Sequence, residues 1–256
     1  MEILVDSAAL AAEAGGMKTD TICGLKPVDA LFRRRPEAVL RLFYAEGLRA
    51  AAGPHCSILA AARKPYRMVE ADELEKIAGT PHHGGMVAVA RARIPVIFDV
   101  LQPPKVKLLL VLDGIGNPHN LGAIARSAAF FGVDAMLLSE GAGDAMPSDA
   151  AYRTAEGGLE MIDIYRSRNL PNILANLDGH YRTVAASLSR EAVPMSELPR
   201  DRPIALVLGN EENGVSPPVM EACRRHVRIA GSGRVQSLNV AQAAAVLLAD
   251  LTGAIG

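Results

Sequence analysis

Three short polar stretches in the second half of the chain have residue types that can hold a small polar ligand. The first contains Asn120 and Arg126, the second ends at Glu211, and the third contains Ser237 and Asn239. Amide, carboxylate and hydroxyl groups can orient a ligand, and a guanidinium can hold a phosphate or stabilise a developing negative charge. Each stretch taken alone also suits a polar turn or a capped surface helix.

The second stretch follows a buried strand. The five apolar residues from Ile204 to Leu208 are too few for a helix of ordinary length, and Gly209-Asn210 follows them directly, so the pattern predicts a strand that ends in a turn. Ligands bind at the carboxyl ends of strands in open α/β sheets. The candidate ligand site therefore comprises Asn210, Glu211, Ser237 and Asn239.

The first stretch follows a loop that lacks a nicotinamide-binding fingerprint. Gly114 and Gly116 fit the first two glycines of such a loop, but His119 stands at the third position. We expect Asn120 to cap the helix that follows. Gly122 lies early in this helix, where glycine costs about 1 kcal/mol relative to alanine, so we expect another group to pack closely against it.

Strands and helices alternate along the second half of the chain, which predicts an α/β domain with a mostly parallel sheet and helices on both faces. The expected strands are Lys107–Leu112, Asp134–Leu138, Met161–Tyr165, Thr183–Ala186 and Ile204–Leu208. The expected helices are Asn120–Phe131, Ser148–Ala155, Leu170–Leu177 and an alanine-rich helix from Asn239. A glycine-containing loop precedes this last helix, and the free backbone N–H groups at the start of the helix can hold an anionic ligand.

The first half of the chain predicts a smaller α/β unit. Its expected elements are a helix at Lys26–Arg34, strands at Val39–Tyr44, Arg67–Val69 and Met86–Ala90, and a helix at Ala71–Ala78. A stretch with three prolines precedes the strand at Lys107, and we place the domain boundary there. The predicted organisation is a poorly ordered lead-in at 1–20, a small domain at 21–95, a linker at 96–105 and a larger domain at 106–256.

Composition limits the class of protein. Half of the 256 residues are hydrophobic and 21% are charged, as in soluble globular proteins. The chain has no apolar run long enough for a membrane span and no signal peptide at its start, so we expect a cytoplasmic protein without membrane contact. Its three cysteines lie far apart, and their spacing predicts neither a disulfide framework nor a metal site.

The charges are unevenly distributed. The formal net charge of −1 argues against a dedicated nucleic-acid binder, but Thr21 to Arg93 holds twelve Lys/Arg against seven Asp/Glu. From Ile94 onward the numbers are fourteen and seventeen. This asymmetry fits a chain that binds an anionic partner with its first half, although a solvated face can have the same excess.

The motifs carry a family resemblance. Asn120-x-Gly-Ala-Ile-x-Arg126, Leu208-Gly-Asn-Glu211 and Ser237-Leu-Asn-Val240 resemble, in order and spacing, the three signature motifs of the SpoU (TrmH-like) family of RNA ribose 2'-O-methyltransferases of the SPOUT superfamily. The resemblance covers about 150 residues. The segments 22–31 and 79–85 are similar to the L30e-like substrate-binding domain that precedes many SpoU domains.

The resemblance implies an enzyme that uses S-adenosylmethionine, a trefoil knot in the second domain, and a homodimer with sites near the subunit interface. The implied cofactor-binding residues are Leu208, Gly209, Asn210, Ile229 and Leu238. The implied catalytic residues are Arg126, Asn120, Glu211, Ser237 and Asn239. Arg126 matches the proposed base of the family, but a guanidinium is normally a permanent donor, so it acts either as base or as electrostatic stabiliser.

The sequence departs from the family pattern at a few positions. Glu212 and Gly84 stand where the family often has glycine and glutamine, Ala241 stands where serine is usual, and Ala230-Gly231 replaces a Pro-Met pair. The polar catalytic positions are all kept, so we expect an active enzyme.

The RNA target is only partly constrained by the sequence. Arg33, Arg34 and Arg35 are candidate phosphate contacts, and the scarcity of aromatic residues predicts a grip by charge and shape without base stacking. The substrate domain favours ribosomal RNA over tRNA. The alternatives are a non-catalytic RNA-binding or ribosome-assembly protein that keeps the fold, and a different nucleotide-binding α/β enzyme.

Overall fold

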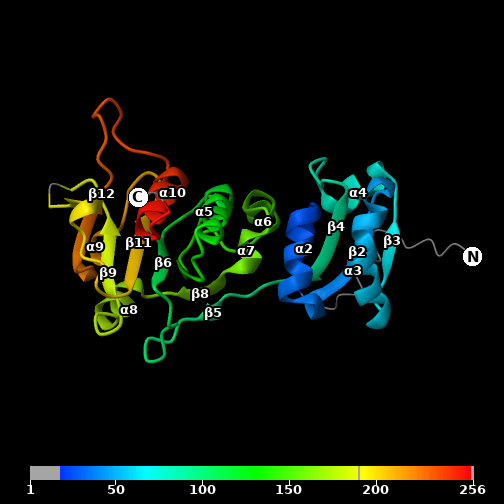
Figure 1. Ribbon diagram of the computed structural model, residues 1–256, viewed down its shortest axis with the longest axis horizontal. Coiled ribbons are helices and arrows are strands. Elements are labelled where there is room, and N and C mark those ends of the chain that lie inside the picture. Colours follow the sequence, from blue (N-terminus) through cyan, green and yellow to red (C-terminus); the bar gives the residue numbers. More distant parts are fainter. Residues whose placement is uncertain (1–17, 190, 255–256) are drawn as a thin grey trace, which may run out of the picture. The chain divides into compact units, whose positions relative to one another are not determined.

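The computed structural model describes residues 18–189 and 191–254, which form two compact units that divide between Ile94 and Pro95 (Figure 1). Each unit has its own sheet. Most of the predicted lead-in, residues 1–17, lies outside the described residues. Within them, no helix is long and apolar enough to cross a membrane.

The first unit contains a mixed sheet with the strand order β1-β4-β2-β3. Strands β1 and β2 run antiparallel to β4, and β3 runs parallel to β2. The strands are β1 (Thr19–Cys23), β2 (Val39–Tyr44), β3 (Tyr66–Met68) and β4 (Met86–Arg91). The helices are α2 (Leu25–Arg34), α3 (Arg49–Ala61) and α4 (Ala71–Ala78), with the 3-10 turns η1 (Pro36–Ala38) and η2 (Glu46–Leu48).

Two elements of this unit depart from the sequence prediction. Strand β1 begins at Thr19, so the poorly ordered lead-in expected up to Asp20 ends earlier than predicted. The reason is that β1 pairs with residues 87–91 of β4. Helix α3 was not predicted. Its sequence contains Gly53 and Pro54, which usually end a helix, but Pro54 lies inside this one.

The second unit contains an all-parallel sheet with the strand order β10-β12-β9-β11-β6-β7-β8-β5, as far as the chain is described. This confirms the predicted parallel α/β class. The strands are β5 (Val96–Ile97), β6 (Leu108–Asp113), β7 (Ala135–Ser139), β8 (Asp163–Ser167), β9 (Arg182–Ala186), β10 (Val193–Pro194), β11 (Ile204–Gly209) and β12 (Arg225–Arg228).

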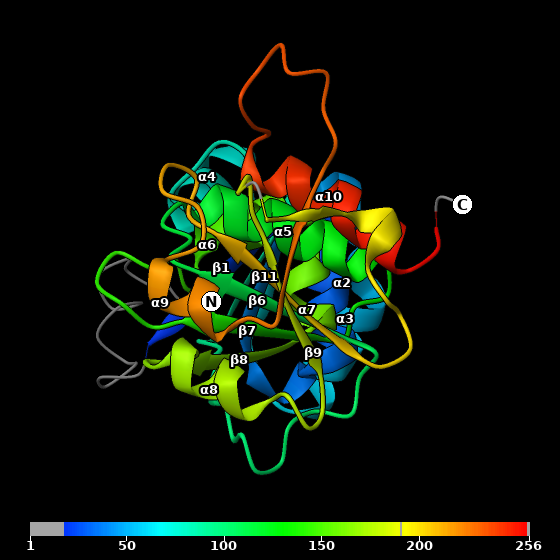
Figure 2. The same ribbon diagram turned by 90° about the vertical axis from the view of Figure 1, so that its left-hand side faces the viewer.

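Helices cover both faces of this sheet (Figure 2). They are α5 (Pro118–Phe130), α6 (Asp149–Ala155), α7 (Gly158–Met161), α8 (Leu170–Asn176), α9 (Pro217–Ala222) and α10 (Val240–Leu251), with the 3-10 turn η3 (Met195–Glu197). Helices α5 and α10 lie on one face, and α8 and α9 lie on the other. Alternate residues of the central strands, such as Leu109 and Val207, pack in one core cluster with Leu174 of α8 and Val219 of α9.

The two central strands form the switch point of the sheet. From β6 the chain adds β7 and β8 on one side, whereas β11 lies on the other side of β6, between β6 and β9. Gly209 is in register with Asp113, so the loops after both strands leave from the same edge of the sheet. A switch point of this kind is where ligands bind in open α/β folds. The trefoil knot stays a prediction.

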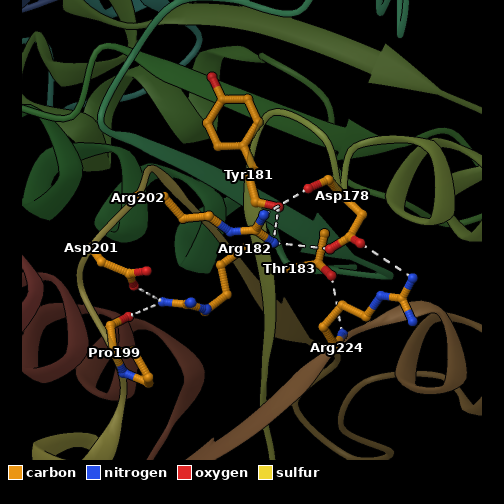
Figure 3. Close-up of polar contacts among 8 residues, drawn as sticks. All are labelled: Asp178, Tyr181, Arg182, Thr183, Pro199, Asp201, Arg202 and Arg224. Atoms are coloured by element: carbon orange, nitrogen blue, oxygen red, sulfur yellow. Dashed lines mark hydrogen bonds and ion pairs between the residues drawn. The ribbon is translucent and has the colours of Figure 1, made fainter.

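The amino ends of the strands carry a network of arginines and aspartates (Figure 3). Arg202 donates to the Asp178 carboxylate at 2.9 Å, and Arg224 pairs with the same carboxylate at 3.2 Å. Hydrogen bonding from Arg202 lowers the pKa of Asp178, and hydrogen bonding from Arg182 lowers the pKa of Asp201. These contacts fasten the start of β9 to the segment that enters β11.

Candidate active site

Asn117, and not Asn120, caps helix α5. The Asn117 side chain accepts a hydrogen bond from the backbone N–H of His119 at 2.8 Å, and Pro118 occupies the first helical position. Proline favours that position because it lacks an N–H and its φ is already helical. The predicted cap at Asn120 is therefore wrong by one turn. As a result the Asn120 side chain can make contacts outside the helix.

Asn120 joins the three polar stretches. Its Nδ2 donates to Oε1 of Glu211 at 2.5 Å, and its Oδ1 accepts from Nδ2 of Asn239 at 3.3 Å. Asn239 also caps α10, because its Oδ1 accepts from the backbone N–H of Ala241 at 2.8 Å. The contacts span 91 and 119 residues of sequence. One side chain from each predicted motif thus meets the others at the carboxyl edge of the sheet.

The loop after β11 folds back tightly on its own strand. Asn210 and Gly214 exchange backbone hydrogen bonds of 2.9 Å. A Cβ at Gly209 would lie 2.0 Å from the backbone nitrogen of Val215, so only glycine fits there. The Asn210 side chain donates to the carbonyl of Gly114 at 2.8 Å and thereby ties this loop to the one after β6.

Asp113 is a site residue that the sequence prediction missed. It ends β6, and its Oδ2 accepts from the backbone N–H of Ser216 at 2.8 Å. The available signal was a carboxylate directly after an apolar strand. Nearby, burial raises the pKa of the Cys223 thiol to about 12, and the charge of Asp113 adds to this rise. Cys223 therefore stays protonated at neutral pH and cannot serve as a thiolate nucleophile.

The close approach expected at Gly122 is confirmed. A Cβ there would lie 2.5 Å from the carbonyl oxygen of Ala151 and 2.7 Å from Cβ of Thr154, both on α6. Gly158 has a similar role, since its Cβ would lie 2.9 Å from Cα of Arg126. The two glycines allow α6 and α7 to pack directly against the backbone of α5. This packing fixes the helix that carries Asn120 and Arg126.

The remaining predicted site residues are not part of the hydrogen-bonded group of Asn120, Glu211 and Asn239. Arg126 is exposed on α5, and Ser237 is exposed in the loop before α10; within the described chain, neither side chain forms a hydrogen bond or ion pair. Leu208 is buried, Ile229 is partly buried and Leu238 is 44% exposed. The whole loop from 230 to 239 is exposed and projects from the unit (Figure 2, orange).

The predicted RNA contacts lie at the end of α2 in the first unit. Arg33 and Arg34 are exposed. The Arg35 side chain is only 14% exposed, pairs with Asp20 at 3.7 Å and donates to the carbonyl of Arg91 at 2.7 Å. Arg35 therefore holds the end of its own domain together, whatever else it contacts.

A surface hollow elsewhere in the second unit is separate from the motif residues. Its lining includes Lys105, Lys107, His180 and Pro203, which lie beside the amino ends of β6, β9 and β11. Asn120, Glu211 and Asn239 lie at the opposite edge of the same sheet. The hollow is therefore not part of the candidate active site.

Family models match both units. Residues 107–249 match the SpoU rRNA Methylase family, and residues 21–95 match a domain described as RNA 2'-O ribose methyltransferase substrate binding. The chain is 33% identical over 247 residues to the 23S rRNA (guanosine-2'-O-)-methyltransferase RlmB of Acinetobacter baylyi, and the alignment covers 90% of this chain and 96% of that protein.

A second relative is longer than this chain. The uncharacterised tRNA/rRNA methyltransferase YfiF of Escherichia coli O157:H7 is 33% identical over 231 residues, which are 90% of this chain and 66% of that protein, just under two thirds of its length. Among solved structures, the AdoMet-bound rRNA methyltransferase of Sinorhizobium meliloti has the same fold, with a TM-score of 0.77, 20% identity and coverage of 98% of this chain and 91% of that one. The chain therefore belongs to the SpoU rRNA methylase family and has the family's RNA 2'-O ribose methyltransferase substrate-binding domain before the methylase domain.

Proposed function

We propose that this S-adenosylmethionine-dependent RNA 2'-O-methyltransferase acts on ribosomal RNA, with its active site built on Asn120, Glu211, Asn239 and Arg126. The observation that carries the site assignment is the convergence of three distant motifs on the Asn120 side chain. The choice of RNA is supported by the relative from Acinetobacter baylyi, which is named as a 23S rRNA methyltransferase. This substrate implies a cytoplasmic location.

The residues at the strand edge fit S-adenosylmethionine. The cofactor has an adenine ring and an aliphatic chain, which need apolar contacts and backbone hydrogen bonds. Leu238 and Val235 are 44% and 73% exposed in the loop before Asn239, whose side chain contacts the site. Apolar side chains in this loop are therefore accessible to a ligand. We assign cofactor contacts to Leu208, Gly209, Asn210, Ile229 and Leu238. When bound, S-adenosylmethionine supplies an electrophilic methyl group.

Asn120 organises the polar side of the site. It donates to the Glu211 carboxylate and accepts from Asn239, so all three side chains are held in one hydrogen-bonded chain. A held carboxylate can accept a proton or a hydrogen bond from a ribose hydroxyl. Ser237, two residues before Asn239, adds a hydroxyl from the same loop. We propose that these groups orient the ribose.

Arg126 is the key catalytic residue in this proposal. It lies on α5 six residues after Asn120, which places it about 120° around the helix axis. Its exposed guanidinium can reach an RNA phosphate and stabilise negative charge that develops on the ribose oxygen. It acts as the base only if its neighbours in the RNA complex help it lose a proton. A pH profile of the rate separates these two roles.

Arg126→Ala tests the assignment. The variant should bind S-adenosylmethionine as the wild type does in calorimetry, because no predicted cofactor contact is changed, but its rate of methyl transfer to ribosomal RNA should fall by about 10² to 10⁴. Arg168→Ala is the matched control, since the Arg168 side chain is 81% exposed on another segment. A wild-type rate in Arg126→Ala would refute the catalytic role.

We also propose a homodimer that forms through α5. Phe130 is 83% exposed on this helix, four residues after Arg126, and so on the same face. Val246 is 40% exposed on α10, which packs against α5. An aromatic ring this exposed on a rigid helix is typical of an interface. A partner on this face would lie next to Arg126.

A further inference from the structure

The loop between β7 and α6 lies at the same edge of the sheet as the candidate active site, although it contains no motif residue. We call residues 140–148 the β7 loop. The loops after β6, β7 and β11 all leave from this edge, because the three strands are neighbours and run parallel. The backbone N–H of Ala145 donates to the carbonyl of Ile115 at 2.7 Å, so the β7 loop contacts the loop after β6.

Asp144 fixes the end of β7 from within the β7 loop. Its Oδ2 accepts from the Ser139 hydroxyl at 2.5 Å and from the backbone N–H of Gly141 at 2.8 Å. A carboxylate only accepts, so the hydroxyl proton points to Asp144 and the lone pairs of Ser139 Oγ remain available. One of them accepts from the backbone N–H of Gly114 at 2.8 Å. The carboxylate therefore determines the direction of the next hydrogen bond.

Gly114 connects Ser139 to the loop after β11. Its φ of +71° lies in the left-handed region that favours glycine. Its N–H is held by Ser139, and its carbonyl accepts from Nδ2 of Asn210 at 2.8 Å. Oδ1 of Asn210 accepts from the backbone N–H groups of Glu212 and Asn213 at 2.9 and 3.2 Å. The Asn210 amide thus has a fixed orientation and closes the loop after β11.

Ion pairing does not account for the position of Asp144. Among the described residues its half-buried carboxylate forms no ion pair, and its donors are the Ser139 hydroxyl and the Gly141 N–H. Asp178, in contrast, pairs with two arginines. The strands do not depend on Asp144 either, since β6, β7 and β11 pair along their lengths and have buried residues. The hydrogen bonds of Asp144 therefore set the geometry of the loops.

We propose that Asp144 and Ser139 are positioning residues that orient Asn210 for S-adenosylmethionine. This inference rests on the proposed function, which assigns Asn210 to the cofactor. Neither positioning residue touches the cofactor, because Asp144 orients Ser139, Ser139 orients Gly114, and Gly114 orients Asn210. A loop that already has its bound geometry loses less conformational freedom on binding, so these hydrogen bonds raise the affinity for the cofactor.

The effect should fall on cofactor affinity and not on the rate at saturation. Glu211, on the same loop as Asn210, is held separately by Asn120. Arg126 lies on α5, outside these hydrogen bonds. Loss of either positioning residue should raise Kd and KM for S-adenosylmethionine about tenfold and change kcat at saturating cofactor by about twofold at most.

Four variants test the proposal. Ser139→Ala and Asp144→Ala each remove one positioning side chain, whereas Asp144→Asn keeps an acceptor oxygen and should retain most of the affinity. Glu140→Ala is the matched control in the β7 loop, because Glu140 pairs with Arg166 and Arg168 and not with the positioning residues. Calorimetry gives the affinity for S-adenosylmethionine, methyl transfer to ribosomal RNA gives kcat and KM, and melting followed by circular dichroism shows that each variant is folded.

The double variant Ser139→Ala/Asp144→Ala should bind the cofactor as weakly as each single variant, because both residues act through the same hydrogen bonds. Glu140→Ala should keep the wild-type affinity even if it melts earlier. Wild-type affinity in Ser139→Ala would overturn the proposal. So would multiplied losses in the double variant, an equal loss in Glu140→Ala, an Asp144→Asn as weak as Asp144→Ala, or a lower kcat with unchanged KM.

Asn210→Ala separates this inference from the proposed function. If Asn210→Ala binds S-adenosylmethionine as the wild type does, the cofactor assignment of Asn210 fails and the inference fails with it. If Asn210→Ala weakens binding but Ser139→Ala does not, the inference alone fails. If the Asn210, Ser139 and Asp144 alanine variants all lose affinity while the wild type methylates no ribosomal RNA, the inference stands and the proposed RNA target fails.

Discussion

Asn120 can take part in the site because Asn117 caps helix α5 in its place. Asn117 accepts the hydrogen bond that the first turn needs, and Asn120 points its amide to Glu211 and Asn239. At α10, in contrast, one side chain, Asn239, both caps the helix and contacts the site. Small polar side chains at two helix starts thus position the catalytic groups.

Two aspartates at the amino ends of the strands make the stability of the fold depend on pH. Hydrogen bonds from Arg202 and Arg182 hold the pKa values of Asp178 and Asp201 below their usual value of about 3.9. Because the folded pKa is depressed, the stabilisation is fully present above pH 3.9 or so and is lost as the pH falls through the lowered folded value. The pairs therefore add stability at neutral pH.

Asp178→Asn should lower the melting temperature at neutral pH, because Arg202 and Arg224 lose their shared carboxylate. The difference from the wild type should shrink as the pH falls below about 4. Thermal unfolding monitored by circular dichroism across this range measures it. Glu221→Gln, which changes an exposed carboxylate on α9, should show little difference at any pH. A constant deficit for Asp178→Asn down to low pH would contradict this account.

At the residue scale, the sequence predicts which residues form the site better than it predicts which hydrogen bonds they make. Asn120, Glu211 and Asn239 were predicted, and the structure brings them together. The cap at Asn117 was missed because both asparagines suit a helix start, and only the proline between them favours the earlier one. Asp113 was missed because its partner, the backbone of Ser216, lies 103 residues away.

Helix α5 combines several functions along its length. It carries Asn120 in its first turn, Gly122 against α6, Arg126 beyond that, and Phe130 at its end. The face with Arg126 and Phe130 is exposed, whereas the residues Leu121, Ile124 and Ala128 are buried. The helix thus links the active site to the proposed subunit interface.

Phe130→Asp tests that interface. The wild type should have twice the mass of one chain in light scattering, and the variant should have the mass of a single chain, because a charge in the centre of an apolar interface is left unpaired. Leu188→Asp is the control, as Leu188 is 62% exposed in a loop outside α5. A wild type with the mass of one chain would contradict the proposal, as would a dimeric Phe130→Asp.

Element prediction succeeded where local pattern decides structure. Strand β2 and helix α4 agree with the expected ranges. The bounds of β6, β7, β9 and β11 differ from the expected ones by one residue at most, because a parallel sheet buries apolar runs of this kind. Strand β8 begins two residues later than expected, since the short helix α7 occupies Gly158–Met161. Short elements such as β5, α9 and β10 contain too few residues to show the hydrophobic periodicity of a strand or a helix.

At the scale of the whole molecule, the chain order of the strands differs from their order in the sheet. The insertion of β11 beside β6 brings the second motif to the first, and α10 then brings the third. The hydrophobic periodicity of the sequence does not specify this insertion, because tertiary packing determines which strands are neighbours.

The most direct measurement is the position of the transferred methyl group. Wild-type chain is incubated with methyl-labelled S-adenosylmethionine and, in parallel reactions, with unmodified ribosomal RNA or unmodified tRNA. The RNA is then digested to nucleosides, which are separated. The label should appear in 2'-O-methyl nucleosides of ribosomal RNA, and Asn120→Ala should lower its rate of incorporation by about 10² to 10³, as for loss of an orienting donor. Asn172→Ala, on the exposed side of α8, should leave the rate unchanged. Label on a base, label in tRNA alone, or wild-type incorporation by Asn120→Ala would contradict the account.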